Sequence, residues 1–369
     1  MLHEMRVAVT LEQLWHTVPG GTAVAALELV AALDRRGDVD LVGVTARHRH
    51  PPPAPWRPSI RLESLWPSRL LLYELWHSRL PLAPRVERAS GAVDVVHGTG
   101  VVFPIADAPV VMTIHDLAFL DDPTLVTKHG LRFFRRATEL TREHARLVMC
   151  SSRATMADCV VAGFELDRLR LVPLGVNAVV RTEDEVANAR AKFGITRPYV
   201  MFIGTVEPRK NLPRLLRAFA SLPRDNVDLV LVGPTGWNES LDADLARIEG
   251  RVHTLGFLDR AERDALLAGA AVFCLPSLKE GFGLPVLEAM VQGAPVVTSA
   301  DTSTAEVAGD AALLVDPLDE VAIADAIGEV LDDSVLAERL ATAGRDNAAL
   351  YTWERTAAAT MAVYAEALG

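Results

Sequence analysis

Two glutamates stand eight positions apart in the segment PSLKEGFGLPVLEAMVQGAPVV (276–297), and their spacing suggests a binding site. Pro285 suits the first turn of a helix, and Gly293 suits the position just after its end. Glu280 is therefore expected on the loop before this helix, and Glu288 about one turn inside it. Both carboxylates would then lie close to the helix N-terminus.

A glycine-rich helix start leaves backbone N–H groups open, and such a terminus can hold a diphosphate. A carboxylate would repel the phosphates, but it can accept hydrogen bonds from neighbouring hydroxyl groups. We expect Glu280 to bind hydroxyls of a sugar ring and Glu288 those of a ribose. The alternative is an ordinary helix with an acidic start that its dipole favours, and the pair alone does not decide between the two.

A second candidate segment, TVEPRKN (205–211), follows the apolar run YVMFIGT (199–205) and precedes a predicted helix. Arg209 and Lys210 would then lie at a strand end beside a helix start. There they could neutralise a pyrophosphate as its charge develops on leaving. Two adjacent basic residues are otherwise an ordinary solvated surface pair.

The first half of the chain adds candidates at strand ends, where ligands of open α/β sheets bind. Gly20 and Gly21 form a turn that opens a helix after the first strand. His115 ends the run VVMTI and precedes Asp116, which suits a turn or cap. His97 also lies at a strand end and could line an acceptor, although a lone histidine is usually structural.

The segment 276–297 resembles the E-x7-E motif of the retaining glycosyltransferases of family four, which have the GT-B fold. The segment 205–211 is similar to the family's donor-diphosphate segment. TIHDLAFL (113–120) resembles a segment of mannosyl-type members, in which the histidine faces the transferred sugar. One departure is Thr205, because many relatives carry an arginine there, so the donor phosphates would rely more on Arg209 and Lys210.

The motifs and the resemblance together imply a catalytic set and a donor-binding set. The expected catalytic residues are His115, Glu280, Arg209 and Lys210. The expected donor-binding residues are Gly20, Gly21, Gly204, Thr205, Gly256, Phe257, Gly281, Phe282, Gly283, Leu284 and Glu288. The resemblance implies front-face transfer in which the diphosphate takes the acceptor proton, while a covalent intermediate on Glu280 stays open.

The donor is expected to be a nucleotide sugar, with GDP-mannose preferred and UDP- or dTDP-sugars as the next choices. The acceptor would be a glycan, a lipid-linked molecule or a small molecule. No cofactor and no metal are expected, since no DxD pair stands where a metal site would be. The alternatives are a GT-B nucleotide-sugar epimerase and a non-catalytic nucleotide-sugar binding protein.

Short apolar runs alternate with helical segments along the whole chain, which predicts an α/β fold with parallel sheets covered on both faces. Two such series, divided near 174–185, predict two Rossmann-like doubly wound domains facing a deep cleft. We expect an acceptor domain over 1–176 and a donor domain over 177–352. The terminal helix at 353–369 could dock on either domain, with docking back on the first as the preferred choice. The expected strands are 5–10, 41–46, 93–98, 110–116, 147–152, 169–173, 199–205, 228–234, 252–257, 271–277, 294–299 and 312–317.

Composition sets the outer limits on function. The 369 residues are 50% hydrophobic and 23% charged, with a net charge of -11, as in a globular protein. Residues 179–369 carry 17 Lys and Arg against 29 Asp and Glu, so this part does not suit nucleic acid. The three cysteines stand singly, as buried thiols do in a reducing compartment. With no apolar run of spanning length and no signal peptide, a cytoplasmic location is expected.

The segment 65–89 mixes aromatic and basic side chains, with Trp66, Tyr73 and Trp76 among Arg69, Arg79, Arg85 and Arg88. Such a stretch could lie against anionic lipid at the inner face of the membrane and deliver a lipid-linked acceptor. The alternative is a helix that packs on the core and has basic ends.

Overall fold

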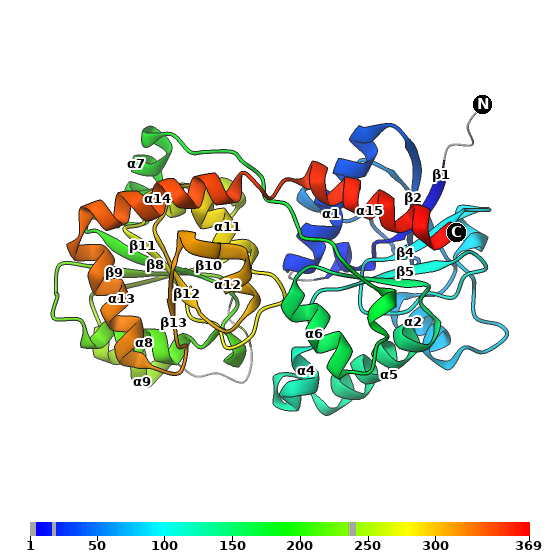
Figure 1. Ribbon diagram of the computed structural model, residues 1–369, viewed down its shortest axis with the longest axis horizontal. Helices are drawn as coiled ribbons and strands as arrows, with labels where there is room; N and C mark the ends of the chain where they lie inside the picture. Colours follow the sequence, from blue (N-terminus) through cyan, green and yellow to red (C-terminus); the bar gives the residue numbers. More distant parts are fainter. Residues whose placement is uncertain (1–4, 17–19, 235, 237–240) are drawn as a thin grey trace. The chain divides into compact units, whose positions relative to one another are not determined.

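The computed structural model describes residues 5–16, 20–234, 236 and 241–369 of the chain. Contacts between residues divide the chain into two compact units (Figure 1). The first unit comprises Met1–Gly175 and Thr352–Gly369, and the second comprises Val176–Tyr351. Each unit is described by itself.

The described part of the first unit contains a parallel sheet of seven strands in the order β3-β2-β1-β4-β5-β6-β7. The strands are β1 Met5–Thr10, β2 Val39–Thr45, β3 Arg61–Ser64, β4 Val95–Gly98, β5 Val110–Ile114, β6 Leu147–Cys150 and β7 Leu169–Leu171. The helices are α1 Gly21–Arg36, α2 Arg69–Ser78, α3 Glu87–Ser90, α4 Ala118–Asp121, α5 Lys128–His144, α6 Arg153–Val161 and α15 Trp353–Leu368. Helices α1 and α15 cover one face of the sheet, and α2, α5 and α6 cover the other (Figure 1).

The described part of the second unit contains a parallel sheet of six strands in the order β10-β9-β8-β11-β12-β13. The strands are β8 Tyr199–Ile203, β9 Asp228–Val232, β10 Val252–Gly256, β11 Val272–Leu275, β12 Val296–Ser299 and β13 Leu313–Val315. The helices are α7 Glu183–Lys192, α8 Leu212–Ser221, α9 Asp242–Leu245, α10 Arg260–Ala268, α11 Leu284–Val291, α12 Ser303–Ala308, α13 Glu320–Asp332 and α14 Ser334–Ala348. Helices α8 and α13 pack together, as do α11 and α14.

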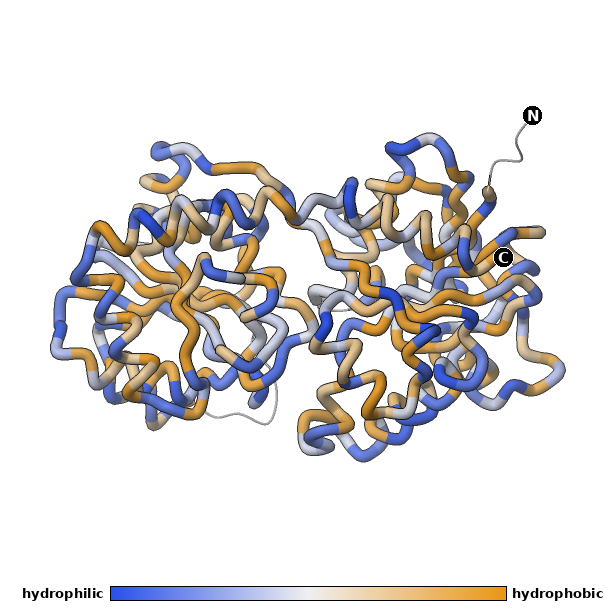
Figure 2. The backbone as a smooth tube through the Cα atoms, viewed as in Figure 1, coloured by the Kyte–Doolittle hydropathy of each residue, from blue (hydrophilic) through white to orange (hydrophobic). Residues whose placement is uncertain are grey.

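Apolar strands hold each sheet between its two helix layers. All residues of β8, β9 and β11 are buried, and so are those of β4 and β6 in the first unit. Figure 2 shows these strands as hydrophobic segments inside each unit. Both sheets are therefore doubly wound, as the uninterrupted apolar runs predicted. Each of the twelve expected strands is present.

One strand, β3, was not predicted from the sequence. Its sequence RLES is half exposed, and it pairs only with β2 at the edge of the sheet. An edge strand needs no continuous apolar run, so periodicity gave no signal for it.

The terminal helix α15 returns to the first unit and packs on α1 and on strands β4, β5 and β6. Two ion pairs, Arg35 with Glu354 and Arg170 with Glu366, tie its ends to that unit. The chain crosses itself closely at its entry, because a Cβ on Gly175 would lie 2.3 Å from the backbone nitrogen of Trp353. The last helix is thus an integral layer of the first unit.

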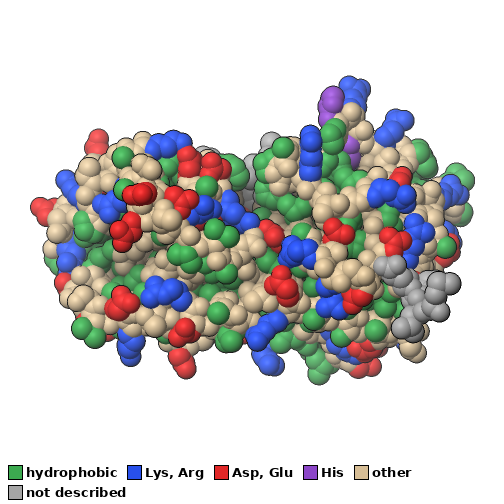
Figure 3. Space-filling view, turned by 90° about the horizontal axis from the view of Figure 1, so that it is seen from above, with side chains coloured by type: hydrophobic (Ala, Val, Ile, Leu, Met, Phe, Trp, Pro, Cys, Tyr) green, Lys and Arg blue, Asp and Glu red, His purple; other side chains and the backbone are tan. Residues whose placement is uncertain are grey.

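On the face drawn in Figure 3, charged side chains of both signs are interspersed with apolar ones. The three cysteines are buried and free, as expected; the sulfur atoms of Cys150 and Cys159 lie 3.8 Å apart. Within the described residues, no helix combines the length and the apolar character needed to cross a membrane.

Candidate active site

The order of strands in the second unit marks a binding position at its carboxyl edge. Strand β8 lies in the middle, and the chain runs outward from it to β9 on one side and to β11 on the other. In a doubly wound sheet, ligands bind outside the carboxyl ends of the two strands at this switch point. The loops after β8 and β11 are the two segments 205–211 and 276–283, which the sequence singled out.

The loop after β8 is shaped by close backbone contacts. The amide of Gly204 donates to the carbonyl of Val232, and a Cβ on Gly233 would lie 2.0 Å from the carbonyl oxygen of Gly204. The chain then passes through the half-buried Thr205 into a short 3-10 helix, Pro208–Lys210. Asn211 adopts a left-handed conformation with φ 59°, and its side-chain amide donates to the carbonyls of Pro276 and Pro317. These bonds tie the loop after β8 to the loops after β11 and β13.

The same two loops bring three predicted catalytic residues together. Glu280 accepts hydrogen bonds from Arg209 Nη1 at 2.9 Å, from Lys210 Nζ at 2.5 Å and from Ser277 Oγ at 2.7 Å. Glu280 and Lys210 are both buried, with 7% and 6% of their surface exposed. The backbone carbonyl of Glu280 accepts from Ser303 Oγ at 2.7 Å. The carboxylate therefore has a fixed position.

Charge pairing sets the ionisation of this cluster. Burial alone would raise the pKa of Glu280, but Lys210 and Arg209 outweigh it and lower the pKa to about 2. Burial also lowers the pKa of Lys210, against the opposing effect of Glu280. The pair is thus a buried ion pair in which each charge depends on the other.

A fourth charged residue balances the cluster. Glu207 is buried and its Oε1 lies 2.8 Å from Arg209 Nη2. Two carboxylates and two cations give zero formal charge. An ammonium has three N–H donors, so Lys210 keeps N–H donors beyond its bond to Glu280. An incoming anion can use these without breaking the ion pairs.

Helix α11 follows this loop, and the backbone at its start requires a glycine, Gly283. Gly283 has φ 110°, and a Cβ on it would meet Thr304 Cγ2 at 2.9 Å. It is the N-cap of α11, so the first N–H groups of the helix lie next to the Glu280 loop. Gly293 follows the helix with φ 76°, as expected for its C-terminal end.

Glu288 lies inside α11, as predicted, but it has a partner that the sequence did not indicate. Its Oε1 accepts from Arg263 Nη2 on α10 at 2.7 Å. Arg263 is 25 positions away, and no local motif could have linked the two residues. Their proximity arises only because α10 packs against α11.

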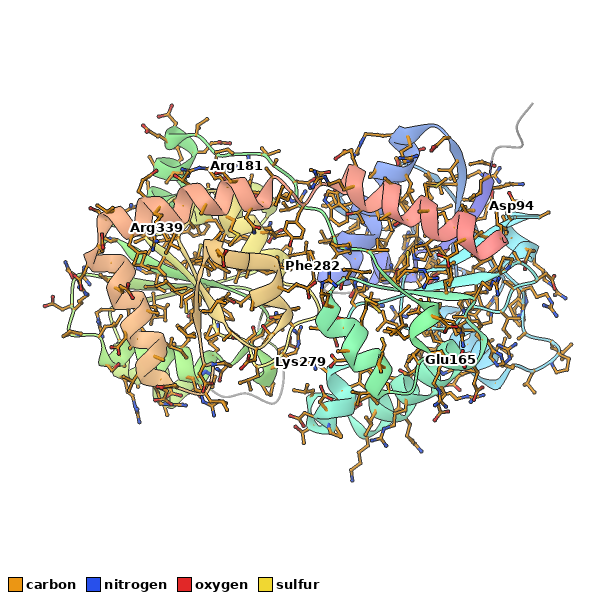
Figure 4. The ribbon with its side chains drawn as sticks, viewed as in Figure 1. Asp94, Glu165, Arg181, Lys279, Phe282 and Arg339 are labelled. Carbon is orange, nitrogen blue, oxygen red and sulfur yellow. The ribbon has the colours of Figure 1, made fainter. Side chains whose placement is uncertain are left out.

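The other predicted donor-binding residues of the second unit differ in exposure. Gly281 precedes α11 and Leu284 is its first residue. The Phe282 side chain, labelled in Figure 4, is buried. Its ring lies edge-on to that of Tyr351, with the ring centroids 5.9 Å apart. A contact from Phe282 to a ligand would thus come from its backbone. Gly256 ends β10 with φ 64°, and Phe257 after it is 65% exposed.

The predicted residues of the first unit lie at the carboxyl edge of its own sheet. Gly20 is the N-cap of α1 and Gly21 its first residue, with open space around both. His115 follows β5 and is half-buried; burial lowers its pKa. The backbone carbonyl of His115 accepts from Thr155 Oγ1 at 2.9 Å. Asp116 Oδ1 accepts from the amide of Ala118 at 3.2 Å, which is the turn role expected for it.

His97 does not line an acceptor surface, contrary to the alternative that its strand-end position left open. It is fully buried and accepts or donates at both ring nitrogens, to Tyr364 Oη at 2.7 Å and to Thr113 Oγ1 at 2.8 Å. Burial lowers the pKa of His97 to about 3, so the ring is neutral. Its role is to join β4 and β5 to the terminal helix α15.

The part of the chain that the structure describes contains no group of three or more His, Cys, Asp or Glu side chains placed to hold a metal ion.

Both halves of the chain match known family models, and the chain is similar to known proteins. Residues 19–180 match the model "Glycosyltransferase Family 4", and residues 185–347 match "Glycosyl transferases group 1". The chain is 31% identical over 280 residues to O-antigen chain mannosyltransferase B of Escherichia coli, covering 73% of this chain and 74% of the relative. It is 37% identical over 211 residues to an MMP alpha-(1->4)-mannosyltransferase of Mycolicibacterium hassiacum, covering 55% and 49%.

Solved structures show the same fold at low sequence identity. HepE of Anabaena in complex with UDP and glucose superimposes with a TM-score of 0.76 at 18% identity, over 98% of this chain and 100% of that one. WaaG, a glycosyltransferase involved in lipopolysaccharide biosynthesis, has a TM-score of 0.72 at 20% identity, over 96% and 99%. The chain belongs to the family 4 glycosyltransferases and has the GT-B fold.

Proposed function

We propose that this glycosyltransferase moves a hexose from a nucleotide-sugar donor to an acceptor hydroxyl, with retention at the anomeric carbon. The main support for this proposal is the cluster of Glu280, Arg209 and Lys210 at the switch point of the second sheet. It offers fixed cations for a diphosphate and a fixed carboxylate for sugar hydroxyls, next to the start of α11.

Each group then has a role in the transfer. Arg209 and Lys210 stabilise the charge that grows on the diphosphate as the bond to the sugar breaks. Glu280 orients the sugar through its hydroxyls, and Glu288 holds the ribose. The diphosphate oxygen takes the proton of the acceptor hydroxyl, which attacks from the same side. We also propose that Gly20, Gly21 and His115 contact the donor. No metal ion is assigned to this reaction.

GDP-mannose is the proposed donor. Two of the relatives are named mannosyltransferases, which supports mannose as the sugar. HepE was solved in complex with UDP-glucose, which makes UDP-sugars the next candidates. The comparisons give no support to an epimerase. The acceptor is assigned only to the broad class of glycans, lipid-linked molecules and small hydroxyl compounds.

A thermal-shift panel of nucleotide sugars tests the donor assignment. A ligand that binds the folded state raises the melting temperature according to its affinity. We expect GDP-mannose to give the largest rise, GDP alone a smaller one, and free mannose none. A larger rise with a UDP- or dTDP-sugar would reassign the donor, and no rise with any nucleotide sugar would contradict the proposed function.

We further propose that the first unit makes peripheral contact with anionic membrane at the cytoplasmic face. Five apolar side chains in 66–82 are exposed, and Leu70 and Leu82 are exposed by 73% and 81%. The other three are Trp66, Leu71 and Leu80. We name these five residues the 66–82 patch. Exposed leucines beside basic side chains suit an interface that carries both acyl chains and negative headgroups.

Part of the segment instead packs on the core, as the alternative predicted. Trp76 is buried and donates to the carbonyl of Pro84, and the Tyr73 ring packs against Phe133. Arg85 pairs with Asp107 at 2.8 Å. The membrane role is therefore assigned to the 66–82 patch with Arg79 and Arg88, which are exposed.

A further inference from the structure

Arg263 holds the Glu288 carboxylate from a neighbouring helix. Its Nη2 donates to Glu288 Oε1 at 2.7 Å, and its Nε and Nη2 lie 3.2 and 2.9 Å from Asp264 Oδ1. The side chains of Arg263 and Glu288 are only 20% and 13% exposed. Because a planar guanidinium binds two carboxylates at once here, its orientation is fixed.

Asp264, which binds Arg263, is held in turn by a second arginine. Asp264 also faces Arg181, whose Nη2 lies 3.8 Å from Asp264 Oδ2, and Arg181 pairs with Glu185 on α7 at 3.1 Å. Despite burial, Glu288 and Asp264 together raise the pKa of Arg263, so it stays cationic. The charges alternate from α7 through α10 to α11, and this fixes the guanidinium before any ligand arrives.

The pairing leaves one oxygen of Glu288 for a ligand. In the described part of the chain, Arg263 is the one ion-pair partner that Glu288 has, and it contacts Oε1. Oε2 has no partner among those same residues. The two hydroxyl groups of a ribose are uncharged donors. They need a hydrogen-bond acceptor in a defined orientation, such as Oε2, more than they need a full negative charge.

Arg263 also changes the charge near the proposed diphosphate site. A lone carboxylate one turn inside α11 would repel the phosphates that its N-terminus is assigned to hold. A paired carboxylate keeps its hydrogen-bond acceptor and loses most of this repulsion. A bound ribose and a bound diphosphate are thereby compatible on one short helix.

We propose that Arg263 is a positioning residue that orients Glu288 toward the ribose hydroxyls of the donor and so makes the enzyme selective for ribonucleotide over 2′-deoxyribonucleotide sugars. This inference rests on the proposed function, because it requires a nucleotide donor in which Glu288 binds the ribose. Arg263 touches no reacting atom. Its effect appears in donor KM and not in kcat.

The test compares GDP-mannose with its 2′-deoxyguanosine analogue, using kcat and KM for wild type and Arg263→Met. Wild type is expected to prefer the ribonucleotide donor by about tenfold or more in KM, as one lost hydrogen bond to a charged group implies. In Arg263→Met the KM for GDP-mannose rises about tenfold, while the KM for the deoxy analogue and kcat stay within about twofold. If the thermal-shift panel identifies another nucleotide sugar as the donor, that donor and its 2′-deoxy analogue are compared in the same way.

Three further variants separate positioning from folding. Arg263→Lys keeps the charge but not the two-carboxylate geometry, so it is expected to recover only part of the discrimination. In a Glu288→Gln background, Arg263→Met should have no further effect on the KM ratio. Glu262→Gln is the matched control, because Glu262 lies on the same helix and pairs with Lys192 at the surface. It should behave as wild type.

An equal rise of KM for both donors in Arg263→Met and Arg263→Lys would overturn the inference and leave Arg263 a structural residue. So would an unchanged KM for both donors. An additive effect in the Glu288→Gln background would also overturn it. Absence of turnover by wild type with every nucleotide sugar would instead contradict the proposed function, so the two failures are distinguishable.

Discussion

Glu280 and Lys210 depend on each other, and this changes how their variants should be interpreted. We expect Lys210→Ala or Glu280→Ala to lower turnover at least about a hundredfold, because each removes fixed charge from the reacting centre. Each variant also leaves the other charged residue buried without its ion-pair partner, which typically costs about 3–5 kcal/mol of stability. Initial rates with saturating donor, alongside melting temperatures, check the prediction.

The double variant Lys210→Met/Glu280→Gln separates the two effects. It removes both charges, so no buried ion is left unpaired, and its melting temperature should lie above those of the single variants. Its turnover should remain as low as theirs. Near-normal turnover in a folded single variant would contradict the catalytic assignment.

Sequence reasoning named the residues of this cluster but not their contacts. Arg209 and Lys210 were assigned to a diphosphate and Glu280 to a sugar, each on its own. The structure pairs all three because β8 and β11 are neighbours, although 71 positions separate Arg209 from Glu280. Strand order is set by long-range packing, so motif spacing could not predict it. Arg263 was missed for the same reason.

At the scale of elements, the contact between β4 and α15 should make stability depend on pH. The pKa of His97 is about 3 in the folded chain and near 6.5 when unfolded. Between these values the unfolded state binds more protons, so the folded state loses stability as pH falls below about 6.5. The slope from one such group is at most about 1.4 kcal/mol per pH unit.

His97→Gln can keep both hydrogen bonds but cannot titrate. We expect its melting temperature to fall less than that of wild type between pH 7.5 and pH 5, measured by circular dichroism. Tyr364→Phe removes one of the two bonds and should lower stability by about 1–3 kcal/mol at neutral pH. Equal falls in wild type and His97→Gln would show that His97 does not contribute to the acid sensitivity.

The close contact between Gly175 and the start of α15 gives a second test of how the elements pack. Gly175→Ala places a Cβ 2.3 Å from the backbone of Trp353, and neither chain segment can move without disturbing α15. We expect a clear loss of stability, about 2 kcal/mol or more. Gly328→Ala is the matched control, since it lies inside α13 with its nearest neighbour at 3.9 Å. It should be neutral or stabilising by up to about 1 kcal/mol.

Elements were the most predictable part of this chain. Buried parallel strands are continuous apolar runs, so their positions could be read directly, as in YVMFIGT and DLVLVGP. The edge strand β3 has no such run and could not be found. The packing side of α15 was a choice between two docking possibilities, because an amphipathic pattern shows that a face is buried and not what buries it.

At the scale of the molecule, the 66–82 patch predicts binding to anionic vesicles. Co-sedimentation should retain wild type on vesicles that contain phosphatidylglycerol and release it with rising salt. Leu80→Ser/Leu82→Ser and the double variant Arg79→Ala/Arg88→Ala should both bind at least about fivefold more weakly. Val335→Ser, an exposed apolar residue of the second unit, is the control. Equal binding by all variants would remove this patch as a membrane contact.

Charge is also distributed unevenly over the molecule. Residues 1–178 have 20 Lys and Arg against 19 Asp and Glu, whereas the rest of the chain is strongly acidic. The cluster of Glu207, Arg209, Lys210 and Glu280, by contrast, is locally neutral. We therefore expect donor binding to depend on a few fixed cations and helix N–H groups and not on the net charge of the second unit.

Above all, we propose that this chain breaks the bond between a sugar and a nucleoside diphosphate. Phosphorus-31 NMR of the most stabilising nucleotide sugar, incubated with wild-type protein and EDTA, tests it directly. We predict that the donor signals give way to those of the free nucleoside diphosphate, slowly alone and faster with an acceptor, and that Lys210→Ala leaves them unchanged. A donor that stays intact, that converts to an isomeric nucleotide sugar, or that is cleaved only after magnesium or manganese is restored would contradict the account.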